Sequence, residues 1–545
     1  MAPTSIVGAR AGGGAPGPAT APATATAPAT EPHADGQAAG AGPSVAASPR
    51  RVWWITFTAL FLIMASWAVA MPEGGNSDEV GHIERAYAVA TGQVLGTPSV
   101  DHWNRPAATF TVPNSLIPRD VECMYGPRIS AACLAFPHDQ HRIKVNSWTG
   151  RYNPLYYLPV GIPMAISPDF AGVVAGRLVS ALMSALVLAS AFSSAARMRS
   201  RLFSTAVLLA ATPAVMNLGS AINPNGIEIA AAILLWTSAL VLIIKAEDLS
   251  TPDRKRLLHL LVAAACILLT VRALGPVWVA LTLAVLAMVL GRQRVMDLVR
   301  RRPLGPTAII SLAGLAGIAW NLLADNYSYY PMQSSTDSLF RNGLLFHSTT
   351  RNLVLLLDNE VDSWTREAVG VAVESASITP WILVLTWLAP AILLTGAGLL
   401  SPTRRHRTAV LTALTAPFAV AVYLDLSYAT KVGWTQNGRY YLPLLVGVVI
   451  CAAAVAPDLP PEWNTESRLA RTAVLATATC QLASLAITLA RFKNGYTPAP
   501  NPISGTWHPP MGTITPFALM TAGIAILGLH LTQGQRRKRT KAATK

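Results

Sequence analysis

The chain has 545 residues, of which 52% are hydrophobic and only 13% are charged, and its formal net charge at pH 7 is +15. A soluble protein carries about 25% charged residues, so this composition excludes a soluble globular enzyme and indicates an integral membrane protein. The positive residues cluster between apolar runs, at Arg197–Arg201, Arg254–Arg256, Arg300–Arg302, Arg404–Arg407 and Arg536–Arg539. Such clusters are typical of the cytoplasmic loops of membrane proteins, and they do not suggest a nucleic-acid partner.

Residues 1–50 are rich in Ala, Pro, Thr and Gly, which predicts a disordered cytoplasmic tail because such a sequence cannot bury a core. The apolar run at 52–71 follows Arg50 and Arg51 and is long enough to span a membrane. Ala68-Val69-Ala70 resembles a signal-peptidase site. The many later apolar runs nevertheless favour an uncleaved first helix with a cytoplasmic N-terminus.

A polar segment at 72–152 comes next, and its length predicts a functional loop rather than a simple connection. The apolar segment 153–166 is short and contains three prolines. Further spans are expected at 171–195, 202–220, 226–244, 258–273, 276–290, 306–324, 377–399, 408–427, 441–457, 470–490 and 514–531. If all basic clusters are cytoplasmic, 153–166 is interfacial or re-entrant and the protein has about 12 spans; if it crosses, the number is about 13.

The predicted architecture is therefore an all-α polytopic membrane domain at 51–533 with a basic cytoplasmic tail at 534–545. Large extracytoplasmic loops are expected at 72–152 and 325–376, and both termini are expected in the cytoplasm. Cys123 and Cys133 lie in the first of these loops. Outside the cytoplasm they are candidates for a disulfide, and two free thiols are the alternative.

The stretch NSDEVGHIERAYAVATGQVLG, from Asn76 to Gly96, follows the first span directly. It predicts a helix over about 77–91, which Asn76 or Ser77 caps and Gly92 ends. Residues four or three positions apart share a face of a helix, so the spacing places Asp78, Glu79, His82 and Arg85 on one side.

Three interpretations of this cluster compete. The first is helix capping with carboxylates at the positive end of the helix dipole, which does not explain His82 with Arg85. The second is a zinc site, because DEVGH is similar to the HExxH motif; here Asp78 replaces the first histidine and no third ligand is evident. The third is a catalytic carboxylate pair, Asp78 and Glu79, at the boundary between lipid and water.

Four motifs in order carry a family resemblance: Asp78–Tyr87 (DEVGHIERAY), Asn153–Pro159 (NPLYYLP), Ala221–Ala230 (AINPNGIEIA) and Asn437–Pro443 (NGRYYLP). An acidic pair directly after the first span, in a large external loop, resembles the GT-C superfamily of membrane glycosyltransferases. The four motifs together are similar to an uncharacterised family of bacterial multi-span membrane proteins with DExxHxxRAY and GRYxLP motifs, itself thought to be GT-C-like.

The chain departs from the family pattern at two points. It has Asn153-Pro154 where paired prolines are usual, and Asn225 where an acidic residue often follows the Asn-Pro of the third motif. The second departure argues against a catalytic role for that turn.

The resemblance implies a GT-C-like bundle and a sugar donor linked to polyprenyl phosphate. Inverting transfer needs a base for the acceptor hydroxyl and cations for the leaving phosphate. By resemblance Asp78 is the base, and Glu79 orients it or helps to bind a divalent metal such as Mg²⁺ or Mn²⁺. The expected partners are the lipid-linked sugar, membrane lipids and an extracytoplasmic glycan or protein acceptor.

For the phosphate, Arg439 is the first candidate, and Arg85 and Arg272 are the others. Snorkelling at the interface, or pairing with a buried carboxylate, would also account for these arginines. His82, Tyr87 and Tyr440 complete the predicted substrate-binding set, with an aromatic belt as the alternative for the tyrosines. The leading hypothesis is a glycosyltransferase; the alternatives are a transporter or flippase of a lipid-linked glycan, and a non-catalytic membrane scaffold.

Overall fold

The computed structural model describes residues 48–101, 106–119, 123, 129–135, 137, 139–301, 303–325, 348–373, 376–432, 434, 437–457, 465–495 and 501–533. Residues 1–47 of the predicted disordered tail and the predicted basic tail at 534–545 lie outside the described residues. The first helix begins at Pro49, so the last residues assigned to the N-terminal tail are helical.

The apolar runs form helices because a backbone within lipid must satisfy its own hydrogen bonds. The helices of the membrane bundle are α1 (Pro49–Ala70), α4 (Phe170–Ala195), α5 (Arg201–Ala210), α6 (Pro213–Ser220), α7 (Pro224–Ile244), α8 (Thr251–Val271), α9 (Gly275–Leu290), α11 (Leu304–Leu323), α14 (Trp381–Leu399), α15 (Arg404–Val432), α16 (Gly438–Val455), α17 (Thr465–Asn494) and α18 (Ile514–Gln533). The polar helix α10 (Arg292–Arg301) follows α9 and has no buried residue.

Among the described residues, nine helices are long and apolar enough to cross a membrane, or up to 11 if each of two bent pairs counts as one span. The pair α5 and α6 is bent by 58°, and the pair α9 and α10 by 115°. The polytopic helical architecture is therefore confirmed, with fewer clear spans than the expected number of about 12. The difference includes α8, which is helical as expected but carries four charged residues, at 253–256, near its start.

The segment 153–166 forms α3 (Pro154–Ile166), a helix of 13 residues. At 1.5 Å per residue it reaches about 20 Å, which is less than the hydrocarbon thickness of about 30 Å. Its length therefore agrees with the prediction that it does not cross the membrane by itself.

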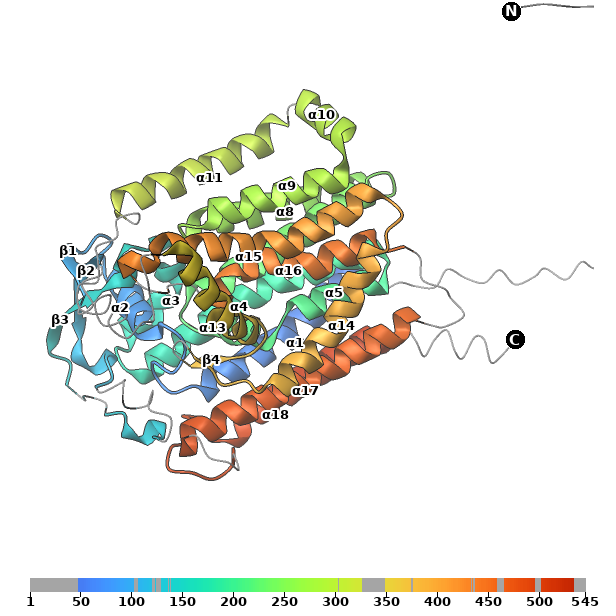
Figure 1. The fold of residues 1–545 in the computed structure, drawn as a ribbon. Helices are drawn as coiled ribbons and strands as arrows, with labels where there is room; N and C mark the ends of the chain where they lie inside the picture. Colours follow the sequence, from blue (N-terminus) through green and yellow to red (C-terminus); the bar gives the residue numbers. More distant parts are fainter. Residues whose placement is uncertain are drawn as a thin grey trace, which may run out of the picture. The chain divides into compact units, whose positions relative to one another are not determined.

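The first large loop folds into a small domain at one end of the bundle (Figure 1). It contains α2 (Glu79–Ala90) and an antiparallel sheet, an element that the all-α expectation missed, with the order β1 (Thr97–Val100), β2 (Pro106–Pro113) and β3 (Arg142–Ser147). The strands pair in the register Thr97 with Thr109 and Thr109 with Asn146. Cys123 and Cys133 are joined by a disulfide.

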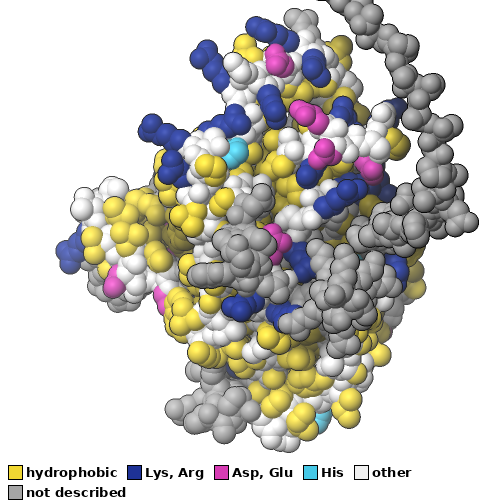
Figure 2. All heavy atoms as spheres, turned by 90° about the vertical axis from the view of Figure 1, so that its right-hand side faces the viewer, with side chains coloured by type: hydrophobic (Ala, Val, Ile, Leu, Met, Phe, Trp, Pro, Cys, Tyr) yellow, Lys and Arg dark blue, Asp and Glu magenta, His cyan; other side chains and the backbone are white. Residues whose placement is uncertain are grey.

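Basic side chains gather at the opposite end of the bundle (Figure 2). The helix α10, which carries four arginines, lies at this end in Figure 1, far from α2 and the sheet. This separation is the one that the positive clusters predict. That the end with α2 faces away from the cytoplasm stays a prediction from the same pattern.

The second large loop is also structured where it is described. It contains α13 (Thr349–Val369) and a short hairpin of β4 (Ala372–Val373) and β5 (Ala376–Ser377). The helix α13 packs against α16, α15 and α6.

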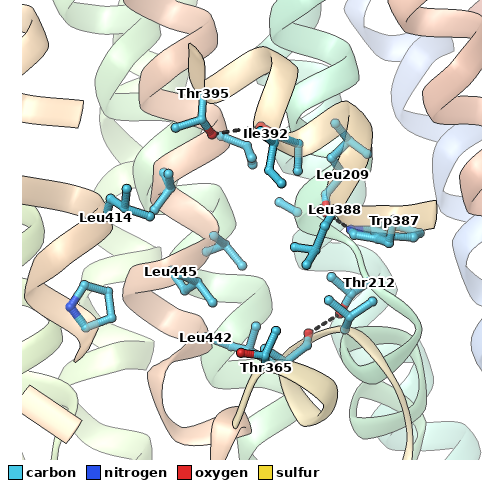
Figure 3. A pocket seen from close by; sticks show the side chains of 18 of the residues that line it. Leu209, Thr212, Thr365, Trp387, Leu388, Ile392, Thr395, Leu414, Leu442 and Leu445 are labelled. Atoms are coloured by element: carbon cyan, nitrogen blue, oxygen red, sulfur yellow. Dashed lines mark hydrogen bonds between the residues drawn. The ribbon is translucent and has the colours of Figure 1, made fainter. Parts of the chain in front are cut away.

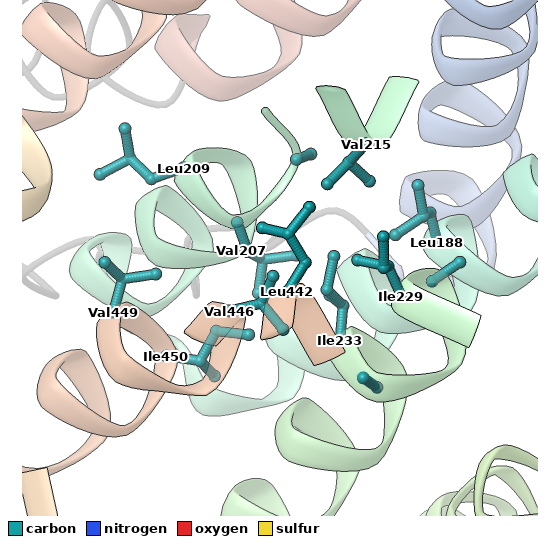
Figure 4. Packing of buried hydrophobic residues seen from close by; sticks show 14 of the residues in the cluster. Leu188, Val207, Leu209, Val215, Ile229, Ile233, Leu442, Val446, Val449 and Ile450 are labelled. Carbon is teal, nitrogen blue, oxygen red and sulfur yellow. The ribbon is translucent and has the colours of Figure 1, made fainter. Parts of the chain in front are cut away.

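The helices α7 and α16 form the interior of the bundle, since 83% of the most apolar stretch of each is buried, against 11% for α11. Figure 4 shows their packing: Leu442, Val446 and Ile450 of α16 lie beside Val207 of α5 and Ile233 of α7. Lipid also solvates apolar side chains, so burying them does not by itself hold the helices together. Close packing between these side chains makes the more specific contribution to the stability of the interior.

Close packing makes a testable prediction at Gly447, where α16 crosses α7. A Cβ atom added there would lie 2.1 Å from the ring of Trp236, a side chain that is fully buried. We expect Gly447→Ala to destabilise the purified protein by about 1–3 kcal/mol because the ring has no room to move. The thermal unfolding temperature in detergent measures this, and the control is Gly305→Ala on α11, where a Cβ meets nothing within 4 Å. Equal unfolding temperatures for the two variants would contradict the prediction.

Candidate functional site

The acidic pair is placed by a tight turn between α1 and α2. The helix α2 begins at Glu79, and Asp78 is its N-cap residue in the left-handed conformation, with φ 60° and ψ 7°. Because Asp78 holds the N-cap position, the prediction that Asn76 or Ser77 caps this helix is wrong. The side chain of Asp78 makes no capping hydrogen bond. A left-handed conformation is uncommon outside glycine, although Asp tolerates it better than most residues.

The carboxylate of Asp78 does not cap α2 and instead faces α16. Nη2 of Arg439 donates to Oδ2 of Asp78 at 2.6 Å. The Arg439 side chain is only 4% exposed and that of Asp78 is 29% exposed, so the pair lies at the edge of the buried region. Nε and Nη1 of Arg439 are buried and have no hydrogen-bond acceptor within the described part of the chain. An acceptor-poor guanidinium beside a partly exposed carboxylate is suited to binding an anion.

A second arginine lies next to this pair. The ring of Tyr440 has the guanidinium of Arg272 at 4.7 Å from its centroid and that of Arg439 at 4.9 Å. Arg272 also lies 3.8 Å from a carboxylate oxygen of Glu228. Cation–π contacts orient a guanidinium without using its N–H donors, so the arrangement brings two predicted phosphate-binding residues to one place.

Glu79 points in the other direction, into the bundle. Its two carboxylate oxygens accept hydrogen bonds from Arg177 at 2.8 and 2.5 Å, and Oε1 also accepts the N–H of Ile222. The two side chains of this ion pair have no exposed surface. Arg177 further donates to the carbonyl oxygens of Met71 and Pro72 at the end of α1. Sequence reasoning did not assign Arg177 a role, although an arginine inside an apolar run was the available signal.

The remaining candidates on α2 are buried in the loop domain. Nδ1 of His82 lies 2.7 Å from the hydroxyl of Tyr157, and burial lowers the pKa of His82 to about 3, so its imidazole is neutral at physiological pH. Arg85 donates to the carbonyl oxygens of Val94 and Tyr152. Tyr87 belongs to the apolar core of this domain and is 5% exposed. The structure therefore buries both side chains in this domain, and their part in substrate binding stays a prediction.

The four sequence motifs meet around the acidic pair. Tyr156 of the second motif accepts the N–H of Asn223 in the third at 2.8 Å, and Asn223 donates to the carbonyl of Ser77 at 3.1 Å. The first motif reaches the second through His82 and the fourth through Asp78. Segments far apart in the chain thus share one hydrogen-bonded network.

A divalent metal held by the acidic pair does not fit these residues. Both oxygens of Glu79 are engaged by Arg177, and Asp78 faces Arg439. Within the described residues, no three His, Cys, Asp or Glu side chains are grouped so that they could hold a metal ion. The donor set is that of two ion pairs rather than that of a cation site.

An apolar cavity of about 440 Å³ adjoins the site (Figure 3). Its walls come from α5, α13, α14, α15 and α16, and they include Leu209, Trp387, Leu388, Leu414, Leu442 and Leu445. At one end it is lined by Gly438 and Tyr441, which flank Arg439 and Tyr440 in the chain. Ile392 also lines it and is 63% exposed, so the cavity reaches the lipid-facing surface of the bundle.

The family of this chain follows from a match over most of its length. The model of the family described as "Predicted membrane protein (DUF2142)" matches residues 61–448. The chain belongs to this family. The match contains all four motifs and therefore both residues of the Asp78–Arg439 pair.

Two crystal structures of ArnT from Cupriavidus metallidurans are similar to this DUF2142 protein. The structure bound to undecaprenyl phosphate has a TM-score of 0.40 and 14% sequence identity, and the match covers 88% of this chain and 76% of that one. The structure in the apo state has a TM-score of 0.41 and 14% identity, with 89% and 77% covered. No protein with a curated description matches the sequence significantly.

A buried acid, Glu73, lies in the turn after α1 and makes the stability of the protein depend on pH. Glu73 has no exposed surface, and neither carboxylate oxygen has a hydrogen-bond partner within the described residues. Burial raises the pKa of Glu73 to about 8, although the nearby Arg177 opposes the shift. The carboxyl group is therefore neutral at physiological pH.

We expect the contribution of Glu73 to stability to decrease between about pH 4.5 and pH 8, because the pKa of Glu73 is higher in the folded than in the unfolded state. The stabilising effect of the bound proton is complete below the unfolded pKa and is lost as the pH rises through the folded value. Glu73→Gln keeps the shape without the titration, so its thermal unfolding temperature should fall less over this range. Asp297→Asn on the exposed helix α10 is the control, and parallel curves for wild type and Glu73→Gln would contradict the prediction.

Proposed function

We propose that this DUF2142 protein is a membrane glycosyltransferase, which transfers a sugar from a polyprenyl-phosphate donor to an extracytoplasmic acceptor. Asp78 is the general base, and Arg439 with Arg272 holds the phosphate. The observation that carries the proposal is the position of Arg439, whose buried Nε and Nη1 have no acceptor in the described chain beside a carboxylate that is 29% exposed. Buried charged donors without acceptors are costly, and a phosphate supplies the missing oxygens.

The apolar cavity supports a donor with a lipid tail. It begins at Gly438 and Tyr441, next to the phosphate-binding residues, and it opens towards lipid at Ile392. A polyprenyl chain is a long apolar group with a phosphate at one end. This combination matches an apolar cavity whose wall includes Gly438 and Tyr441, the residues on either side of Arg439 and Tyr440 in the chain.

The reaction follows from these positions. The acceptor hydroxyl oxygen attacks the anomeric carbon of the sugar, while Asp78 takes the hydroxyl proton. The bond between the anomeric carbon and the phosphate oxygen breaks, and the electron pair leaves with the phosphate, whose charge Arg439 and Arg272 stabilise. Because Arg439 pairs with Asp78 before the donor binds, the phosphate replaces Asp78 as its partner and leaves the carboxylate free to act as a base.

Glu79 has a positioning role in this mechanism. Its buried pair with Arg177 ties the start of α2 to α1 and α4, and thereby fixes the backbone of Asp78. The neutral His82, held by Tyr157, belongs to the same support. A flippase would instead need ionisable groups along a path through the bundle, whereas the groups named here lie at one end.

Asp78→Asn should lower kcat by about 10²–10⁴-fold because it removes the base and keeps the shape. It should also lower the KM for the lipid donor, because the phosphate no longer displaces a carboxylate from Arg439. The assay uses reconstituted full-length protein, a panel of labelled polyprenyl-phosphate monosaccharides and an envelope fraction as the source of acceptors. The transferred label is counted. Glu84→Gln, a carboxylate of α2 outside the site, is the matched control.

Transfer that survives Asp78→Asn unchanged would remove Asp78 as the base. Movement of label across sealed vesicles without transfer would favour the flippase. Absence of both activities with every donor of the panel would favour the scaffold.

Arg439→Gln should raise the KM for the lipid donor by about 10²-fold, and Arg439→Lys should recover only part of the loss. The reason is that lysine supplies a charge but not the planar set of donors. The binding of farnesyl phosphate, measured by calorimetry, checks the same order without turnover. Equal affinity of wild type and Arg439→Gln would contradict the assignment.

A further inference from the structure

Glu367 on α13 lies outside all four sequence motifs, yet it touches the start of α16. Its side chain is 2% exposed. Oε2 accepts the backbone N–H of Gly438 at 2.8 Å, and Oε1 accepts the hydroxyl of Ser363 at 3.2 Å. The carboxylate is thus fixed on both oxygens, one residue away from Arg439.

This contact supplies a cap that the sequence of α16 does not provide. The first backbone N–H groups of a helix have no partner within the helix. Asn437 is the N-cap residue of α16, and its side chain makes no capping hydrogen bond. A carboxylate from another helix takes that place at the positive end of the helix dipole, which is favourable.

The approach of α13 to α16 depends on Gly438. A Cβ atom at this position would lie 2.1 Å from the carbonyl oxygen of Trp364. Close backbone contact at this point explains how a side chain of α13 reaches the first N–H of α16.

The charge of Glu367 also acts on Arg439. Both residues line one small cavity, together with Ser77 and Asn217. Burial raises the pKa of Glu367, whereas the positive charge of Arg439 and the hydrogen bonds from Gly438 and Ser363 lower it and favour the ionised carboxylate. A negative charge held there weakens the positive potential that an incoming anion meets.

The helix α13 contacts the apolar cavity as well. Trp364, Thr365, Ala368 and Val369 belong to its walls. One helix therefore borders the space proposed for the lipid tail and carries the carboxylate that holds the arginine end of α16.

We propose that Glu367 is a positioning residue: it holds the N-terminus of α16, and through it Arg439, and its negative charge weakens the affinity of Arg439 for an anionic headgroup. This inference deepens the proposed function and rests on it for the identity of the anion. It separates two effects of one side chain, a hydrogen bond that places Arg439 and a charge that opposes the ligand.

Two substitutions separate these effects. Glu367→Gln keeps an oxygen acceptor for Gly438 and removes the charge, so the Kd for farnesyl phosphate should fall by about fivefold or more. Glu367→Ala removes both, so Arg439 loses its support and the Kd should rise above the wild-type value. Calorimetry on the full-length protein in nanodiscs measures both. Glu360→Gln, on the same helix two turns earlier, is the control and should leave the Kd unchanged.

If Glu367 held α16 by its hydrogen bond alone and its charge did not act on Arg439, wild type and Glu367→Gln would have the same Kd. This result would overturn the proposal. So does a lower Kd for Glu367→Ala equal to that of Glu367→Gln, because it shows that the hydrogen bond does not place Arg439.

A second measurement is independent of any ligand. Thermal unfolding of Glu367→Gln, Arg439→Gln and the double variant forms a cycle. If the two side chains interact, the double variant loses less stability than the sum of the single losses; additive losses overturn the proposal. Binding of farnesyl phosphate without sugar transfer from any donor would defeat the proposed function and leave this inference to be decided by the cycle and the Gln and Ala variants.

Discussion

The buried ion pair between Glu79 and Arg177 joins the first loop to the membrane bundle. Taking two charges out of water is costly unless each finds its partners, and here the carboxylate and the guanidinium are both saturated by hydrogen bonds. Arg177 holds the end of α1 through Met71 and Pro72 while it holds the start of α2 through Glu79. Hydrogen bonds to one guanidinium therefore hold both ends of the turn between these helices, which contains Asp78.

Two neighbouring carboxylates acquire opposite environments from this turn. Asp78 adopts a left-handed conformation, and its side chain points away from α2 and pairs with Arg439. The side chain of Glu79 points into the bundle and pairs with Arg177. Backbone strain at a non-glycine residue is often kept at functional sites, where the surrounding structure enforces it. In the proposed enzyme, the buried carboxylate of Glu79 fixes the turn, and the partly exposed carboxylate of Asp78 takes part in the reaction.

The proposed site lies where water and lipid meet, and it contains both polar and apolar side chains. Arginines, tyrosines and carboxylates gather at one end of α16, and an apolar cavity extends from there along the same helix to the lipid-facing surface. The helix α13 lies against both parts. Such a boundary favours a ligand with a charged head and a long apolar tail. The identity of the sugar and of its acceptor depends on contacts outside the arginine end of α16 and the apolar cavity.

The sequence by itself determined the membrane class, the helical spans, the separation of basic clusters from the functional end, and Asp78 with Arg439 as candidates, because hydropathy, charge and motifs are local properties. It also indicated the chemistry, since acidic and basic residue types limit what a site can do. Only the tertiary structure decided that Glu79 pairs with Arg177, that Arg85 and Tyr87 are buried, and that Glu367 reaches α16. These outcomes depend on which of many similar side chains approach one another across 71 residues of chain, as for Glu367 and Gly438, or 98, as for Glu79 and Arg177. They also depend on a left-handed turn and a small sheet that local patterns did not reveal.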